Sequence, residues 1–164
     1  MITSSPAVDR TVRRLVQQSN ILVITAAGDS YLDACQTSPP AEDWAYTVGA
    51  SNIDDHFNRP SNFGKCLNNF APGSDIRVAS NLSPHGYKKS TGSHISAAHV
   101  AGVAALVLAA QPDLSPVAVH ARLMAISQQG VVDALPKQTI NQLVNIVQLV
   151  DEQVVVNQDE VVVQ

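Results

Sequence analysis

The sequence predicts a single α/β domain, and three stretches carry this prediction. Residues 6–19 place apolar side chains at helical spacing behind a capping serine and a proline. Residues 21–27 form an uninterrupted, largely β-branched run that Gly28 ends, which is the pattern of a strand buried on both faces. Residues 93–110 follow a glycine and form a long helix of small residues, apolar nearly all round and therefore expected to be buried. A helix leading into a buried strand is typical of α/β architecture.

The composition indicates a folded globular chain and argues against two classes of binding partner. Hydrophobic residues make up 45% of the 164 residues and charged residues only 15%. A formal net charge of −4 and the absence of a basic run argue against nucleic acid or a membrane surface as partner. The apolar run 100–110 is too short to span a bilayer. Residues 1–6 lack the basic and apolar regions of a signal peptide, so we expect an intracellular chain, or a secreted one if it derives from a longer precursor.

The other elements follow in order along the chain. We expect strands at 44–51 and 75–80, a turn at 69–73, and a loop through Pro84, Gly86 and Lys88-Lys89. The helix that begins near residue 93 stops at Gln111-Pro112, and a further helix runs from Ser115-Pro116 to Gly130. Residues 139–150 alternate apolar and polar side chains and fit either helix or strand.

The tail, residues 151–164, differs from the domain at 1–150. It holds two valine triplets, each flanked by polar groups. We expect it either to form strands, as a hairpin or on an exposed sheet edge, or to be disordered.

Two features of the sequence suggest chemistry. Cys35 and Cys66 have no CxxC spacing and are too few for a zinc site, so they form either one disulfide or two buried thiols.

Ser93, His94 and Ser96 lie at the start of the helix 93–110, where free N–H groups carry a partial positive charge. A nucleophile at such a helix start is found in many hydrolases.

Four motifs carry a resemblance to a known family. Residues 92–106 read GSHISAAHVAGVAAL, which resembles the nucleophile motif GTSMAxPHVAGxAAL of the subtilisin-like serine proteases, or subtilases. VITAAGD at 23–29 resembles the family's VAAGN. SP at 38–39 with YTVGAS at 46–51 resembles SPA…TVGA, and SNFG at 61–64 with FAPG at 70–73 resembles FSNYG…FAPG. The motifs cover roughly residues 4–150, and the proteinase K branch is the most similar. The resemblance implies a truncated domain at 1–150, part of a doubly wound, mostly parallel sheet with flanking helices.

The resemblance also assigns roles to individual positions. The nucleophilic serine falls on His94 and the oxyanion-binding asparagine on Asp29, and an ionised carboxylate cannot donate a hydrogen bond. Ser93 and Ser96 take the threonine and alanine positions, where packing is the expected role. The family's other triad members would lie before residue 1. The resemblance thus implies a pseudoprotease that acts by binding or by oligomeric assembly.

A second interpretation keeps an enzymatic role. The positions of Asp29 and His94 face one another in the family fold, so the pair would form an acid/base dyad acting on a small molecule in the former cleft. The competing interpretation is that the pair only satisfies buried polar groups. His99 matches a structural histidine of the motif, for which we expect burial and a hydrogen bond.

The resemblance further implies a disulfide, the loss of a ligand from a calcium site, and the absence of a strand that would pair with the strand 21–27. The DAC and KC segments match a disulfide of some members, so Cys35 and Cys66 would pair in an oxidising compartment. The carboxylate ligand of the family's calcium site falls on Asn68, with Asp43 nearby, so we expect no cofactor and no bound calcium. The strand 21–27 would lack a neighbour, which predicts a homo-oligomer or a complementary N-terminal half, unless the tail covers it.

Overall fold

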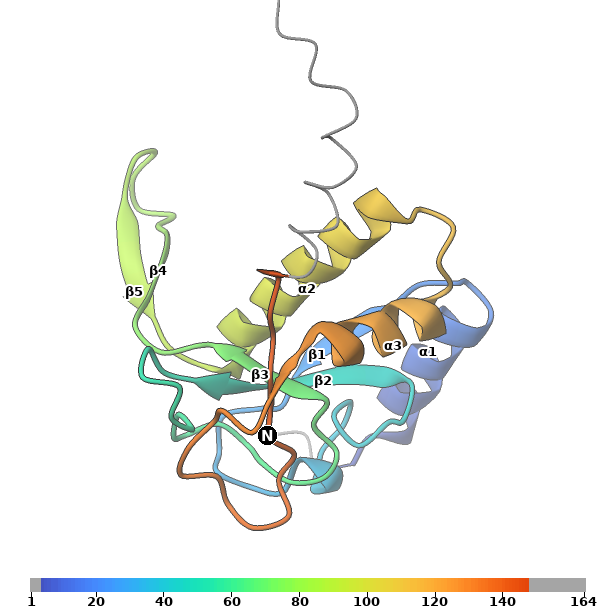
Figure 1. Cartoon of the computed structure of the whole chain (residues 1–164), viewed down its shortest axis with the longest axis horizontal. Coiled ribbons are helices and arrows are strands. Elements are labelled where there is room, and N and C mark those ends of the chain that lie inside the picture. The colour runs from blue at the N-terminus through green and yellow to red at the C-terminus, as the bar shows by residue number, and fades with distance from the viewer. Residues whose placement is uncertain (1–3, 148–164) are drawn as a thin grey trace, which may run out of the picture.

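The computed structural model describes residues 4–147, and the expectations for the tail 151–164 lie outside these residues. The elements follow the chain as α1 (Pro6–Gln17), β1 (Val23–Ala26), the short 3-10 helix η1 (Ala34–Gln36), β2 (Ala45–Ser51), β3 (Asn69–Pro72), β4 (Ile76–Ala79), β5 (Tyr87–Ser90), α2 (Ser93–Ala110), α3 (Pro116–Ile126), β6 (Gln128–Gln129) and β7 (Gln142–Leu143) (Figure 1).

Five strands form the main sheet, in the order β1-β2-β3-β7-β6. The first four strands run parallel, and β6 pairs antiparallel with β7. β4 and β5 form a separate antiparallel hairpin that projects from the body (Figure 1). The prediction of an α/β fold with a mainly parallel sheet and flanking helices is confirmed.

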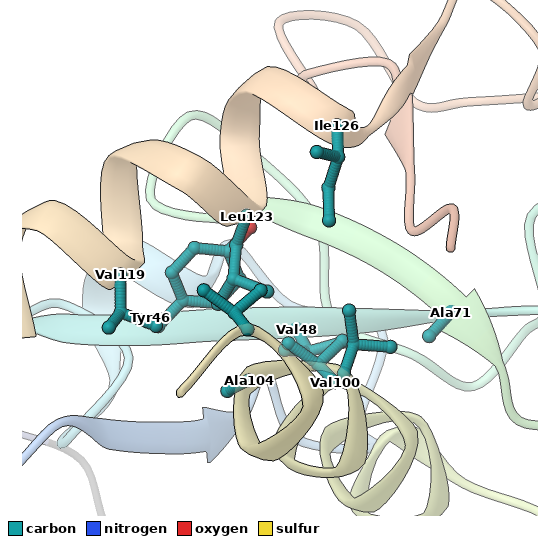
Figure 2. Close-up of a cluster of buried hydrophobic side chains, with 10 residues drawn as sticks. Tyr46, Val48, Ala71, Val100, Ala104, Val119, Leu123 and Ile126 are labelled. Carbon is teal, nitrogen blue, oxygen red and sulfur yellow. The ribbon is translucent and has the colours of Figure 1, made fainter. Parts of the chain in front are cut away.

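β2 is the central strand, and all seven of its residues are buried. Its glycine allows the next strand to pack closely, because a Cβ at Gly49 would overlap the ring of Phe70. One face of the sheet is covered by α2 and α3, with a core of aliphatic side chains around Tyr46 (Figure 2). This core comprises Tyr46, Val48, Ala71, Val100, Val103, Ala104, Val107, Val119, Leu123 and Ile126.

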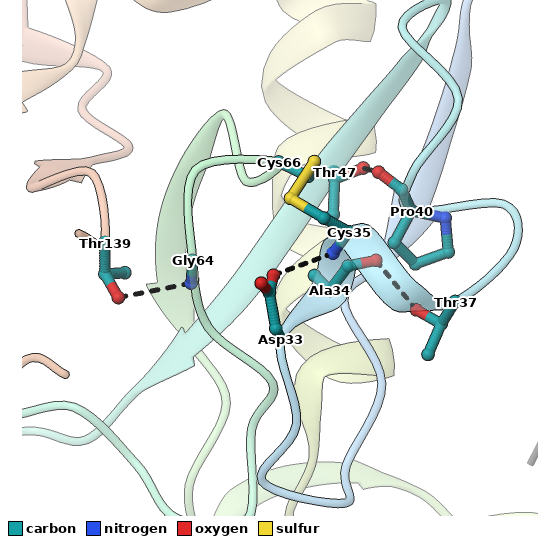
Figure 3. The surroundings of a disulfide bond; sticks show 9 residues. All are labelled: Asp33, Ala34, Cys35, Thr37, Pro40, Thr47, Gly64, Cys66 and Thr139. Atoms are coloured by element: carbon teal, nitrogen blue, oxygen red, sulfur yellow. Dashed lines mark hydrogen bonds between the residues drawn. A yellow bond between two sulfur atoms is a disulfide. The ribbon is translucent and has the colours of Figure 1, made fainter. Parts of the chain in front are cut away.

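The disulfide between Cys35 and Cys66 is confirmed, and it ties η1 to the loop before β3 (Figure 3). The two Cα atoms are 5.3 Å apart, and the sequence separation of the two cysteines is 31. Asp33 positions the first cysteine, because its Oδ1 accepts a hydrogen bond from the Cys35 N–H at 2.9 Å. The bridge lies beside a second apolar cluster, which comprises Ala27, Ala34, Phe57, Leu67, Phe70 and Val132.

Two expectations about burial are wrong. β1 is half-buried along its length rather than buried on both faces, because it is an end strand that pairs, among residues 4–147, only with β2. α2 is not buried all round. Its inner side packs on β1, β2 and β3, but Ala98, Ala101, Ala105 and Leu106 are exposed on its outer side. By length and composition alone α2 could cross a membrane, a property that core helices share.

Three expectations about elements are also wrong. Residues 69–73 are not a turn, since Asn69–Pro72 form β3 between β2 and β7. The loop expected through Lys88-Lys89 contains β5, whose two lysines are exposed. α3 ends at Ile126 instead of Gly130, because Gln128–Gln129 form β6. Of the ambiguous stretch 139–150, Gln142–Leu143 form strand β7, and residues 148–150 lie outside the described part.

The disulfide makes a measurable contribution to stability. We expect the double variant Cys35→Ser/Cys66→Ser to lose about 3–4 kcal/mol in the free energy of unfolding, because the open chain regains the entropy of a long loop. Urea denaturation of the variant and of the oxidised wild type measures the difference. Reduced wild-type protein is the control and should match the variant. An unchanged unfolding midpoint in both would contradict the prediction.

Candidate functional site

The carboxyl end of β1 meets the amino end of α2, where two hydrogen bonds join the two elements and a third joins α2 to β3. The Gly28 N–H donates to Ser93 Oγ at 3.0 Å, and the Ser93 N–H donates to Asp29 Oδ1 at 2.8 Å. Ser96 Oγ donates to the carbonyl of Ala71 on β3 at 2.9 Å. Both serines are fully buried. Their hydroxyl groups therefore hold the backbone together and do not face solvent.

His94 and Asp29 form the polar surface of this junction. His94 Nδ1 lies 3.4 Å from Asp29 Oδ2, and the two side chains are 58% and 29% exposed. Gly92 makes the approach possible: it has φ +149°, and a Cβ there would overlap the His94 imidazole and lie 2.8 Å from Asp29 Oδ2. Asp29 thus uses one oxygen to cap α2 and the other to face the imidazole.

A shallow pocket of about 210 Å³ opens beside Asp29. It is lined by residues 26–30 and 37–40 and by Asn62. Asn62 holds the pocket loop in place, because its Oδ1 accepts from the N–H groups of Ser30 and Leu32, while its Nδ2 donates to the carbonyl of Ala27. The SNFG motif contains Asn62, but the sequence alone does not indicate this positioning role, because the groups that Asn62 binds lie about 30 positions earlier in the chain.

His99 does not take the place expected for it. It is exposed on α2. The expectation of burial was wrong because the outer side of α2, including the neighbouring Ala98, is uncovered in the part of the chain that the structure describes.

The comparisons with known proteins agree with this geometry. Residues 3–143 match the subtilase family. The chain belongs to the subtilase family. It is 35% identical over 146 residues to a subtilisin-like serine protease of Davidiella tassiana, a match that covers 84% of this chain and 28% of that protein. The crystal structure of a cold adapted subtilisin-like serine proteinase superposes with a TM-score of 0.81 at 36% identity, over 86% of this chain and 50% of that one. The chain therefore spans half or less of the length of these relatives.

In this subtilase domain, Asp43 and Asn68 line one open pocket of about 270 Å³. Both polar atoms of the Asn68 side chain contact other residues of the domain. Oδ1 accepts a hydrogen bond from the Thr47 N–H at 2.6 Å, and Nδ2 lies 3.2 Å from His120 Nε2. The other charged groups of the pocket are Lys65, a cation, and Glu42, whose carboxylate pairs with Arg13 at 3.1 Å. Within residues 4–147 no group of three or more His, Cys, Asp or Glu side chains is arranged to hold a metal ion.

His120, on α3, is half-buried in the subtilase domain. Its ring packs edge-on against Tyr46, with the ring centroids 4.7 Å apart. Burial lowers the pKa of His120 and raises the pKa of Tyr46, so Tyr46 stays protonated and offers the imidazole no negative charge. Since Asn68 points its N–H₂ group at His120 Nε2, that nitrogen must accept a hydrogen bond, which only the neutral ring can do.

This arrangement predicts a pH dependence of stability. A histidine whose pKa is lower in the folded than in the unfolded chain binds protons more readily when the chain unfolds. The free energy of unfolding should therefore be highest when His120 is neutral and should fall as the pH drops below about 6.5. We expect His120→Gln to flatten the profile measured by urea denaturation between neutral pH and pH about 5. His85→Gln, in an exposed loop, is the control. An equal slope in wild type and His120→Gln would show that another group controls this range.

Proposed function

We propose that this subtilase domain is non-proteolytic and acts by binding. The observation that supports this is the state of the side chains at the start of α2. Ser93 and Ser96 are fully buried and bound to backbone groups, whereas the exposed side chain is the His94 imidazole. A serine nucleophile must reach its substrate and be activated by a base. An ionised Asp29 beside the same helix start would also repel the negative charge that develops during acyl transfer.

Active-site labelling tests the absence of protease activity. A fluorophosphonate probe reacts with activated serine hydroxyls, and we expect it to leave the full chain unlabelled because neither buried serine is reachable. An active subtilase labelled in parallel confirms the probe, and near-ultraviolet circular dichroism confirms that the chain is folded. Stoichiometric labelling of any serine, located by peptide mass mapping, would overturn the proposal.

The binding surface that we propose combines the outer side of α2 with the free edge of β1. We call it the α2–β1 surface, and it comprises Ile21, β1, Ala98, Ala101, Ala105, Leu106 and Ala109. Ile21 and Leu106 are 49% and 47% exposed, and α2 packs against β1, the strand that begins two residues after Ile21. Among residues 4–147 β1 is the end strand of the sheet, so within this part of the chain its outer N–H and C=O groups have no partner strand and can pair with another strand.

We infer that a second copy of the chain occupies this surface. Neither β1 nor α2 contains a Lys, Arg, Asp or Glu residue, so two copies of the surface can meet without like-charge repulsion. A two-fold axis beside β1 would pair the two strands antiparallel and place the two α2 helices on the same side of a continuous sheet. Such a contact would satisfy the N–H and C=O groups at the edge of β1 and would also bury the apolar outer side of α2.

Association in solution tests this surface. We expect a dimer of the wild-type chain at micromolar concentration by light scattering, and Leu106→Glu to weaken association by roughly 100-fold or more, because it would bury an unpaired carboxylate. Ile53→Glu is the matched control, since Ile53 is 93% exposed in a loop outside the α2–β1 surface. A monomeric wild type, or a dimer that both variants weaken equally, would contradict the inference.

A second function has one observation in its favour. The 3.4 Å separation of His94 Nδ1 and Asp29 Oδ2 suits acid–base chemistry on a small molecule beside the pocket. His94→Ala and Asp29→Asn separate the two functions, and Asn at position 29 keeps an oxygen to cap Ser93. If the domain acts by self-association, both variants dimerise like the wild type, because neither residue belongs to the α2–β1 surface.

We also propose that the domain works without calcium. The Asn68 side chain already contacts Thr47 and His120, which supports this proposal. The pocket that Asp43 and Asn68 line also contains the positively charged Lys65. A hard divalent cation prefers several free, negatively charged oxygens.

A further inference from the structure

We propose that Asn81, at the tip of the β4–β5 hairpin, is an acceptor site for an N-linked oligosaccharide. Residues 81–83 read Asn-Leu-Ser, which fits the acceptor pattern Asn-x-Ser/Thr with x other than proline. No other asparagine in the 164-residue sequence has Ser or Thr two positions later. Because this pattern is common by chance, its position in the structure decides whether the asparagine can be modified.

The structure places the whole triplet at an accessible position. Asn81, Leu82 and Ser83 are all exposed, and Leu82 is 89% exposed. Neither the Asn81 amide nor the Ser83 hydroxyl makes a hydrogen bond to any of the residues 4–147, so neither is needed to hold the hairpin. The hairpin itself projects from the body of the domain (Figure 1). A transferase can therefore reach the acceptor amide without unfolding an element of the main sheet.

The loop is closed by groups other than the acceptor side chains. The Ser80 N–H donates to the Gly86 carbonyl at 2.9 Å, and the Gly86 N–H donates to the Ser83 carbonyl at 3.1 Å. Ser80 Oγ also accepts from the Leu82 N–H at 3.2 Å. These bonds involve the backbone and one neighbouring hydroxyl, so a sugar on Asn81 leaves them intact.

The disulfide provides an independent reason to expect this modification. Structural disulfides form and persist in oxidising compartments, such as the lumen of the secretory pathway, and oligosaccharide transfer to asparagine takes place in the same compartment. A chain that acquires the Cys35–Cys66 bridge there would present the exposed triplet to the transferase. The attached sugar would also cover Leu82, the apolar side chain at the hairpin tip.

The proposed transfer takes its sugar from a lipid-linked oligosaccharyl pyrophosphate. The Asn81 amide nitrogen attacks C1 of the first sugar, and a bond forms between Nδ2 and C1. The bond between C1 and the pyrophosphate oxygen breaks, and the leaving pyrophosphate keeps the electron pair. The amide nitrogen loses one proton to a base of the transferase, so no oxidant or reductant is needed.

Expression of the full chain behind a cleavable secretion signal in a eukaryotic host tests the proposal. We expect a fraction of the secreted protein to carry one glycan that peptide N-glycosidase F removes, as seen in the intact mass. Asn81→Gln and Ser83→Ala should each abolish the modified form. Ser83→Thr, the matched control for Ser83→Ala, should keep it. Pro84 directly after the triplet disfavours transfer, so we expect partial occupancy in the wild type and a larger modified fraction in Pro84→Ala.

A thiol assay makes a negative result decisive. Secreted protein without free thiols has passed through the oxidising compartment and formed the disulfide. If such wild-type protein has only the mass of the polypeptide, Asn81 is not an acceptor in this chain, and a glycan present only in Pro84→Ala would show that Pro84 blocks the site. A glycan that persists in Asn81→Gln would place the modification elsewhere and would equally overturn the proposal.

Discussion

The hydrogen bond from the Ser93 N–H to the Asp29 carboxylate fixes the candidate site. The residue before α2 is Gly92, which has no side chain to cap the helix, so the cap comes from Asp29, 64 positions before Ser93 in the sequence. A carboxylate at this position satisfies a free N–H group and interacts favourably with the helix dipole. Such caps contribute about 0.5–2 kcal/mol. The same carboxylate orients His94, so the cap and the geometry of the polar pair depend on one side chain.

The capping role of Asp29 affects how the Asp29–His94 pair is interpreted. A residue that caps the helix is useful to the fold whether or not any chemistry takes place beside it. The serines at the start of α2 have equally structural roles, one bound to Gly28 and the other to Ala71. The binding proposal therefore accounts for these groups with contacts that the structure contains, whereas the acid–base proposal needs a substrate as well.

The sequence predicts well those elements whose signal is local. α1 begins where a serine and proline predict it, β2 lies within a residue of the expected range, and the motif residues meet at the junction of β1 and α2. β3 was missed because it is four residues long and ends at Pro72, so its turn residues concealed it. β5 was missed because both of its sides face solvent, which removes the alternation that identifies a strand. The exposure of His99 and the partial burial of His120 depend on which elements cover them, and spacing along the chain does not contain that information.

The disulfide has a consequence for how the domain responds to cutting. The cysteines lie on either side of β2 in the sequence, so the bridge encloses the central strand in a covalent loop. A single peptide bond cleaved between residues 36 and 65, for example in the exposed segment around Ile53, leaves both pieces joined through sulfur. The parallel pairing of β2 with β1 and with β3 would then hold the nicked ends in register. Cleavage of one peptide bond in this segment would thus leave the two fragments associated until a reductant breaks the disulfide.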